Sequence, residues 1–422
     1  MLLLSHPTGN MNVRQNALAL AEADQLAEFW TCLHFDVRRW PWKLLPGRLL
    51  QRLDRRSFAL PDPMAIHGHP WRELGRHGAA ALGLHAFSEP CAGPLSVDAV
   101  YHSLDRRVAR RMRVRSDVTG VFCSEDGALE TFRAAKAMGR RCFYELPMGY
   151  WRAARELLQE EAERQPAWAP TLVGNRDTPE KLDRKDEELA LADAVLVASR
   201  FSRGTLAQAQ ATHAPVLVLP YRAMDDAGGS SAAFAHPPRP VHGRKLRLLY
   251  VGSLTQRKGL SYLLEAVQAL EGRVELTLIG RPPAAGCKPL EEAMQRHRWI
   301  ASLPRDEILA EMRRHDLLML PSLFEGFGLV LVEALSQGLP VIATDHSGAP
   351  DIIEDGREGF IVPIRSSDAM VQKLEMLDQD RERLAFMGEN ASRTASRLLW
   401  SDYRRELSTW VAGVMNTAAS RP

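Results

Sequence analysis

The segment from Phe324 to Pro340 has the residue types and spacing that best suit a chemical site. It carries Glu325 and Glu333 eight residues apart, and Gly326 and Gly328 lie between them. A glycine turn that leads from a strand into a helix offers unpaired backbone N–H groups and the positive end of the helix dipole, which suit a phosphate. The two carboxylates could then bind two different sets of sugar hydroxyls. The alternative is that Glu325 only caps the helix and that Glu333 only faces solvent.

Other candidate ligands have less support from their spacing. Asp378 and Asp380 form a D-x-D in a predicted helix, where residues two apart point to different faces. His67 and His69 lack third and fourth partners nearby, so we interpret them as polar surface rather than zinc ligands. We therefore expect no metal site. The cysteines are scattered without a C-x-x-C pair and indicate a reducing compartment; they are Cys32, Cys91, Cys123, Cys142 and Cys287.

Signatures of several other enzyme classes do not occur in the sequence. It has no H-E-x-x-H, no G-x-x-x-x-G-K-[ST] and no G-x-S-x-G. A dinucleotide-dependent oxidoreductase would need G-x-G-x-x-G after a first strand, with an acid about 20 residues further on. That motif does not occur either, so we set the oxidoreductase alternative aside.

Short β-branched runs alternate with longer amphipathic stretches, a pattern that predicts βαβ units on parallel sheets. A Gly/Ser/Ala/Pro-rich stretch at 225–240 has the composition of an exposed linker between domains. The tail from Ser367 onward is predicted to be helical. Two Rossmann-like domains would therefore face each other across a cleft at the carboxyl ends of their strands. The predicted strands are 118–124, 141–147, 194–199 and 214–220 before the linker, and 246–252, 274–280, 316–322 and 339–345 after it.

The composition is that of an ordinary globular protein large enough for two or three domains. The chain has 422 residues, of which 45% are hydrophobic and 25% charged. Its longest apolar runs are far shorter than the roughly 20 residues that span a bilayer. The first ten residues have neither the basic region nor the apolar length of a signal peptide. We expect a soluble, cytoplasmic protein.

Positive charge is concentrated in residues 38–115. This region has 15 Lys and Arg against 6 Asp and Glu. Tryptophan and leucine side chains are interleaved with the cations, as at Trp40, Trp42 and Trp71. Such a mixture could bind anionic lipid on the inner face of the cell membrane. It could also follow a phosphate backbone, although we expect no nucleic-acid partner. The remaining alternative is a solvated helix face.

The order of the motifs resembles that of glycosyltransferase family 4, retaining enzymes of the "glycosyl transferases group 1" type with the two-domain GT-B fold. E-G-F-G-x-x-x-x-E after P-S-x-x looks like the signature of that family. VGSLTQRKGLSYLLEA at 251–266 is similar to the segment that opens its donor domain, and HPTGN at 6–10 to its amino-terminal glycine loop. The resemblance is strong over 246–363, looser over 116–222 and thin over 30–115.

The resemblance implies a domain plan and a role for each matching residue. Residues 1–222 would bind the acceptor, 223–243 would be the linker, 244–398 would bind the nucleotide-sugar donor, and 399–422 would be a helix that packs back on the first domain. The catalytic residues would be Lys258, Arg257 and Glu325. The donor-binding residues would be Gly252, Ser253, Ser302, Leu303, Gly326, Phe327, Gly328, Leu329 and Glu333. The acceptor side would hold Gly9, Asn10, Tyr144 and Glu145.

Two positions depart from the family pattern. Ser253 stands where the family often has an arginine, and Arg257 could supply the missing cation. Tyr144 and Glu145 stand where many relatives have a histidine. A tyrosine donates a hydrogen bond but is a poor proton acceptor near neutral pH.

The function implied by the resemblance is the transfer of a sugar, with retention, from a nucleotide-diphosphate sugar to a glycan or lipid-linked acceptor. This would be a metal-independent hexosyltransferase without a cofactor, acting in cell-surface polysaccharide, exopolysaccharide or glycolipid biosynthesis. The alternative is a catalytically silent glycosyltransferase-like subunit that binds a partner or the membrane.

Overall fold

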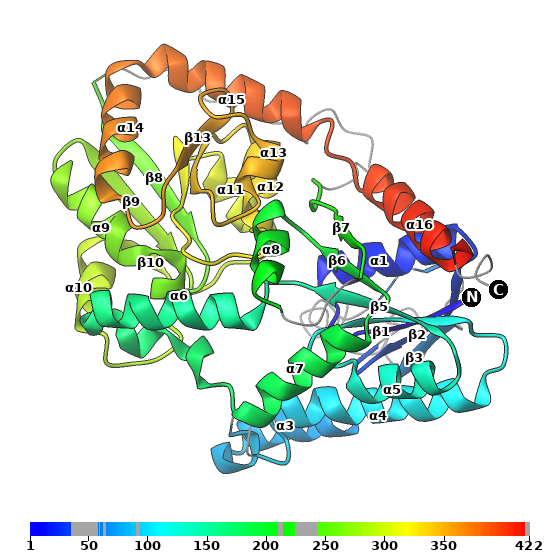
Figure 1. The fold of residues 1–422 in the computed structure, drawn as a ribbon. Coiled ribbons are helices and arrows are strands. Elements are labelled where there is room, and N and C mark those ends of the chain that lie inside the picture. The colour runs from blue at the N-terminus through cyan, green and yellow to red at the C-terminus, as the bar shows by residue number, and fades with distance from the viewer. Residues whose placement is uncertain are drawn as a thin grey trace, which may run out of the picture.

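Two parallel β-sheets, one from each half of the chain, form the framework of the protein (Figure 1). The computed structural model describes residues 1–34, 58, 60–61, 65–89, 93–209, 214–223 and 243–417. The first sheet has the strand order β3-β2-β1-β4-β5-β6-β7 and the second has the order β10-β9-β8-β11-β12-β13. All neighbouring strands in both sheets are parallel. The predicted α/β class with two Rossmann-like domains is confirmed.

The strands at the centre of the first sheet are apolar because helices cover both faces. Every residue of β4 is buried, for example. The strands are β1 (Leu2–Ser5), β2 (Leu26–Thr31), β3 (Ile66–Gly68), β4 (Gly120–Ser124), β5 (Arg141–Leu146), β6 (Ala194–Val197) and β7 (Val216–Val218). The helices are α1 (Met11–Glu22), α3 (Trp71–Ala81), α4 (Val97–Val114), α5 (Leu129–Ala137), α6 (Trp151–Arg164), α7 (Pro179–Leu191) and α8 (Arg200–Thr205).

The second sheet is built in the same way. Its strands are β8 (Leu246–Val251), β9 (Val274–Ile279), β10 (Arg298–Ile300), β11 (Leu317–Leu320), β12 (Val341–Thr344) and β13 (Gly359–Val362). The 3-10 turn η8 (Gln256–Lys258) precedes α9 (Leu260–Ala269), which is followed by α10 (Lys288–Arg296), α11 (Arg305–Met312), α12 (Leu329–Ser336), α13 (Ala349–Ile352), α14 (Ser367–Gln379), α15 (Arg381–Ala395) and α16 (Trp400–Asn416).

The structure corrects the sequence prediction at three places in this half. The short strands β10 and β13, of three and four residues, were not predicted. Both lie at the edges of the sheet and are too short to show a regular alternation: β10 has no buried residue, and β13 has only four residues. Asp380 does not lie inside a helix: it follows the last residue of α14, and its side chain caps α15 through the Arg383 amide. Its neighbour Asp378 instead pairs with Arg273 and Arg381.

The last helix, α16, crosses back and packs on the first domain (Figure 1). The Tyr403 hydroxyl donates to Asn16 Oδ1 on α1 at 2.8 Å, and Trp410 meets the ring of Phe143 on β5. The start of the expected linker is tied to this crossing, because the Ala223 amide donates to the Leu398 carbonyl at 2.9 Å. Residues 224–242 of the linker and 418–422 of the tail lie outside the described residues.

A helical arm of the first half of the chain packs on the second domain. Trp168, in the turn after α6, belongs to the hydrophobic core around β8 and β9. Glu161 on α6 is fully buried and accepts hydrogen bonds from Gln256, from Tyr262 and from Arg365. All three donors belong to the second half of the chain, so the two domains share a buried polar interface.

The basic region is only partly described. Residues 35–57, which include Trp40 and Trp42, lie outside the described residues. On α4, Arg111 pairs with Glu28, whereas Arg110 and Arg113 are exposed. None of the described helices is both long enough and apolar enough to cross a membrane.

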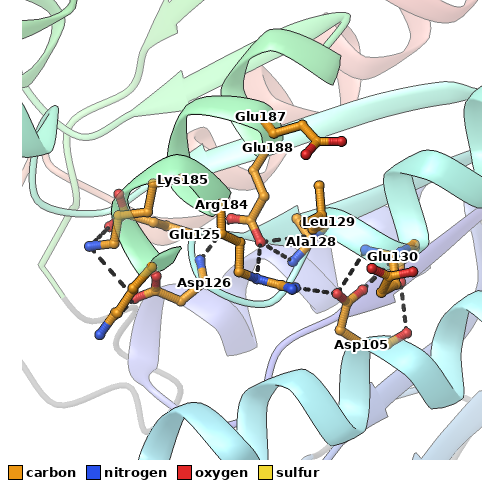
Figure 2. Close-up of polar contacts among 12 residues, drawn as sticks. Asp105, Glu125, Asp126, Ala128, Leu129, Glu130, Arg184, Lys185, Glu187 and Glu188 are labelled. Carbon is orange, nitrogen blue, oxygen red and sulfur yellow. Dashed lines mark hydrogen bonds and ion pairs between the residues drawn. The ribbon is translucent and has the colours of Figure 1, made fainter. Parts of the chain in front are cut away.

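A buried network of charges fixes α7 and α4 to the turn after β4 (Figure 2). Glu188 on α7 accepts the backbone N–H groups of Asp126, Ala128 and Leu129 at 2.9–3.0 Å and so holds the start of α5. Arg184 lies between Glu188 and Asp105 and pairs with both. This network holds the carboxyl end of β4 in place, at the edge of the sheet that faces the second domain.

Removal of Glu188 should destabilise the protein. Glu188→Ala leaves three buried amides without an acceptor, and we expect a loss of about 3 kcal/mol in the free energy of unfolding. The matched control is Glu187→Ala, the neighbouring residue, whose partner Arg133 is half exposed; its effect should stay within about 0.5 kcal/mol. Urea unfolding of both variants checks this, and equal effects would contradict the role given to Glu188.

Candidate active site

The turn between β11 and α12 meets the first domain backbone to backbone. A Cβ atom at Gly326 would lie 1.9 Å from the Pro147 carbonyl oxygen, so no larger residue fits there. The Gly326 carbonyl accepts hydrogen bonds from the Ser199 and Ser202 hydroxyls at 2.6 and 3.1 Å. A Cβ atom at Gly149, on the first domain, would likewise lie 2.9 Å from the Phe324 ring. The glycines therefore let the carboxyl edges of the two sheets touch.

The start of α12 presents free backbone donors. Gly328 has a φ of 91° and caps the helix in a left-handed conformation that favours glycine. Among the described residues, no acceptor takes the amides of Phe327, Gly328 or Leu329. The Phe327 ring itself is buried against Tyr221. This helix start therefore has the donors that an anion needs, as the sequence predicts.

A second glycine contact brings η8 beside this turn. Gly259 has a φ of 69°, and a Cβ atom there would lie 1.9 Å from the Pro321 carbonyl oxygen. The Leu323 amide donates to the Arg257 carbonyl at 2.9 Å. Arg257 and Lys258 therefore approach Glu325, from which they are separated by 67 residues or more in the sequence.

Lys258 and Glu325 form a buried ion pair, and Arg257 completes it. Lys258 Nζ contacts Glu325 Oε2, while Arg257 Nη1 lies 3.3 Å from the same oxygen and donates to the Phe324 carbonyl at 2.6 Å. Burial works against ionisation of Glu325, but the charges of Lys258 and Arg257 outweigh it and hold its pKa below the usual value. Burial lowers the pKa of Lys258, and Glu325 opposes that effect. The three predicted catalytic residues are thus in contact.

The neighbouring donor-side residues are placed as follows. Gly252, at the end of β8, lies against Lys258: a Cβ atom there would be 3.8 Å from Lys258 Cε. Ser253 is exposed, and its carbonyl accepts the Tyr250 hydroxyl at 2.7 Å. Arg257 points to the same carboxylate as Lys258, so a second cation is present although Ser253 stands where the resemblance implies an arginine.

Glu333 lies on α12 and does not take part in the ion pair of Lys258 and Glu325. It has a partner of its own. Arg305 Nε donates to Glu333 Oε1 at 2.8 Å. Arg305 belongs to no motif that the sequence shows, because its contact with Glu333 depends on how α11 packs on α12. Ser302 is exposed, and Leu303 packs partly buried against the core.

The structure corrects the acceptor-side assignment of Tyr144. Its side chain is 1% exposed, in the core under α5, and its hydroxyl lies 3.5 Å from Glu188. Alternate strand residues point to opposite faces, so Glu145 points the other way and accepts hydrogen bonds from Asn12 at 2.9 Å and Ser124 at 2.8 Å. Both side chains are buried, and a buried tyrosine in the core cannot touch an acceptor.

The glycine loop after β1 has a local structural role in this structure. A Cβ atom at Gly9 would lie 2.9 Å from the ring of Phe58, and the Gly9 carbonyl accepts Arg14 Nε at 3.1 Å. Asn10 is exposed and precedes α1 without a side-chain cap. His6, which the sequence analysis missed, is buried at the end of β1, and burial lowers its pKa despite the nearby Glu145.

Other candidate ligands have protein partners. His67 stacks on Trp30, and His69 lies 2.9 Å from the Ser103 hydroxyl. Within the described ranges, no group of three or more His, Cys, Asp or Glu residues could hold a metal ion. Four of the five cysteines are described, and all four are buried and form no disulfide with one another; they are Cys32, Cys123, Cys142 and Cys287.

The second half of the chain has recognisable relatives. Residues 231–394 match the family model described as "Glycosyl transferases group 1". Over 183 residues the chain is 32% identical to a D-inositol 3-phosphate glycosyltransferase of Corynebacterium kroppenstedtii, covering 40% of both chains. Over 150 residues it is 33% identical to the amylovoran biosynthesis glycosyltransferase AmsK of Erwinia amylovora, covering 32% of this chain and 36% of that one. The chain thus spans about two fifths of the length of these curated relatives.

Solved structures match over nearly the whole chain. Sucrose-phosphate synthase from Thermosynechococcus elongatus has a TM-score of 0.66 at 16% identity and covers 99% of both chains. HepE of Anabaena, solved in complex with UDP, has a TM-score of 0.60 at 15% identity and covers 98% of this chain and 99% of that one. These likenesses confirm the expected GT-B fold.

The buried ion pair predicts a pattern of stabilities. Lys258→Met leaves Glu325 buried with only Arg257 as a partner and should cost about 3 kcal/mol in the free energy of unfolding at pH 7. The double variant Lys258→Met/Glu325→Gln removes both charges and should recover most of that loss. Denaturant unfolding of the three proteins measures this.

The loss should also depend on pH. The lowered pKa of Glu325 stabilises the wild type above its ordinary pKa of 4.5, and this contribution disappears as the pH falls through the folded-state value. The difference between wild type and Lys258→Met should therefore shrink below about pH 4.5. A difference that is independent of pH would contradict the ion pair.

Proposed function

We propose, from a GT-B fold and a carboxy-terminal domain of the glycosyl transferases group 1 type, that this chain transfers a sugar from a nucleotide-diphosphate sugar to a glycan or lipid-linked acceptor. The observation that carries the proposal is the contact between Lys258 and Glu325 beside the free amides of residues 327–329. HepE was solved with UDP, and AmsK is named for amylovoran biosynthesis. These names support UDP as the first nucleotide to try and polysaccharide biosynthesis as the setting.

In this proposal the donor diphosphate replaces Glu325 as the partner of Lys258. The donor phosphates bind the ammonium group of Lys258 and the amides at the start of α12, and Glu325 is then free to accept hydrogen bonds from hydroxyls of the transferred sugar. Glu333 would bind the ribose in exchange for Arg305. The leaving phosphate gains negative charge during the reaction. Positive charge that is already in place beside it is the largest electrostatic contribution available to such a site.

The transfer would retain the anomeric configuration. The bond between the sugar C1 and the phosphate oxygen breaks, and its electron pair stays on the phosphate. The acceptor hydroxyl oxygen forms its bond to C1 on the same face, and its proton passes to the departing phosphate. This step needs no protein base, in agreement with a Tyr144 that is buried away from the site. Lys258 and Arg257 supply the positive charge, so the proposed step requires no metal.

Nucleotide binding and turnover test the proposal. UDP, GDP, ADP, CMP and TDP are each added in excess; a ligand at about 100 times its Kd stabilises by about 2.7 kcal/mol and should raise the Tm by a few degrees. We expect a shift with at least one nucleotide diphosphate, and turnover of the corresponding nucleotide sugar that falls by orders of magnitude in Lys258→Met/Glu325→Gln.

The double variant is the control, because it keeps the fold while it removes both charges. No shift with any nucleotide, or a shift without turnover of any sugar donor, would contradict the proposal and favour a catalytically silent subunit.

A further inference from the structure

A cavity of about 380 Å³ lies between the two domains beside the ion pair. The first domain lines it from the end of β4, from α6 and from α7, and the second domain contributes Arg257 and Phe324. These two residues directly precede Lys258 and Glu325 in the chain. The other residues that the proposed function gives to the donor do not line this cavity, which has the size of a small ligand site.

The Glu125 carboxylate, on the wall of this cavity, lacks a hydrogen-bond donor. Its side chain is 11% exposed, and its one ion pair with a described residue is with Lys185, whose Nζ lies 3.7 Å away. No described group donates a hydrogen bond to this carboxylate. Burial raises the pKa of Glu125 to about 7, against the opposing charge of Lys185. A carboxyl group this buried is costly unless a donor reaches it, so the geometry favours a ligand with a hydroxyl group.

Lys185 is the matching donor on the same wall. Its ammonium lies 3.3 Å from Asp177 and 3.7 Å from both Glu125 and Asp126; Figure 2 shows it facing Glu125 and Asp126. Hydrogen bonds from an ammonium to a carboxylate are usually about 2.7–2.9 Å long. These distances are longer, so a hydroxyl group beside the pair could accept a hydrogen bond from Lys185 and donate one to Glu125. Arg155, on α6, is exposed at the mouth and makes no ion pair with a described residue.

The remaining walls are apolar and aromatic. Trp151 on α6 and Phe324 line the cavity together with Met148 and Leu158. Such a combination of flat apolar surface with a few polar groups matches a sugar ring, which has an apolar C–H face and hydroxyls at its edge. A free anion would be repelled by Glu125 and Asp177, and an acyl chain would bring no hydrogen-bond donor to Glu125.

We propose that this cavity binds one sugar residue of the acceptor, with its hydroxyls held by Glu125 and Lys185 and its ring between Trp151 and Phe324. The inference rests on the proposed function and deepens it, because it makes the acceptor a glycan. The acceptor side is thereby assigned to the end of β4, α6 and α7 rather than to Gly9, Asn10 or Tyr144. Arg257 lines this cavity and also contacts Glu325, so a sugar bound here would lie beside the site proposed for the donor sugar.

Binding of simple glycosides tests the inference without knowledge of the acceptor. Methyl α-D-glucoside, methyl β-D-galactoside and methyl α-D-mannoside are titrated into the protein with and without UDP, and binding is read by saturation-transfer NMR. We expect at least one of them to bind the wild type. Ala154→Trp, which fills the cavity, should abolish that binding, and Glu125→Gln should weaken it at least tenfold.

Two substitutions on exposed positions of α6 are the matched controls. Gln159→Trp introduces the same side chain as Ala154→Trp, Glu156→Gln removes one charge as Glu125→Gln does, and neither Gln159 nor Glu156 lines the cavity. Both should bind the glycoside like the wild type, and all four variants should keep the UDP-induced rise in Tm. No glycoside binding by the wild type, or binding that survives Ala154→Trp and Glu125→Gln, would overturn the inference. Loss of UDP binding or of all turnover in the wild type would instead count against the proposed function.

Discussion

The close approach of backbone at three glycines is the constraint on which the site depends. Gly326 touches Pro147 of the first domain, and Gly259 touches Pro321 within the second. Gly280 lies against the Gly252 carbonyl in the same way, which joins the ends of β8 and β9. A Cβ atom at any of these positions would come within about 2 Å of a carbonyl oxygen. Because glycine has no side chain, segments distant in the sequence can meet at these positions, and η8 can reach the turn before α12.

This geometry has an electrostatic consequence. Lys258 and Glu325 are brought together where little water reaches them, so each charge needs a partner. Without a ligand they pair with each other. A buried pair of this kind adds little net stability, because desolvation offsets most of the attraction. It does keep both groups charged and in place. In the proposed exchange, an anionic donor can therefore replace Glu325 as the partner of Lys258 without a large rearrangement. The first domain helps to hold η8 in place, because Gln256 of η8 donates a hydrogen bond to Glu161.

The sequence contained much of this site but only part of its surroundings. Glu325, Lys258 and Arg257 could be identified because they belong to local motifs with fixed spacing. The orientation of β5 could not be identified, because both faces of this strand are buried and its residues do not alternate between polar and apolar. The sequence therefore did not show that Tyr144 points into the core while Glu145 points the other way. Arg305 and Glu125 gain their roles from the packing of separate elements. The packing of α6 on the second domain could not be predicted either, because it also depends on contacts between separate elements. The linker composition places the domain boundary some 60 residues further on.

A crystal structure with UDP tests most directly the proposed exchange, in which Lys258 leaves Glu325 for the donor diphosphate. We expect Lys258 Nζ within about 3 Å of a phosphate oxygen, the amides of Phe327 to Leu329 directed at the same phosphates, and Glu325 released from the ion pair. UDP bound elsewhere, with the contact between Lys258 and Glu325 intact, would contradict it.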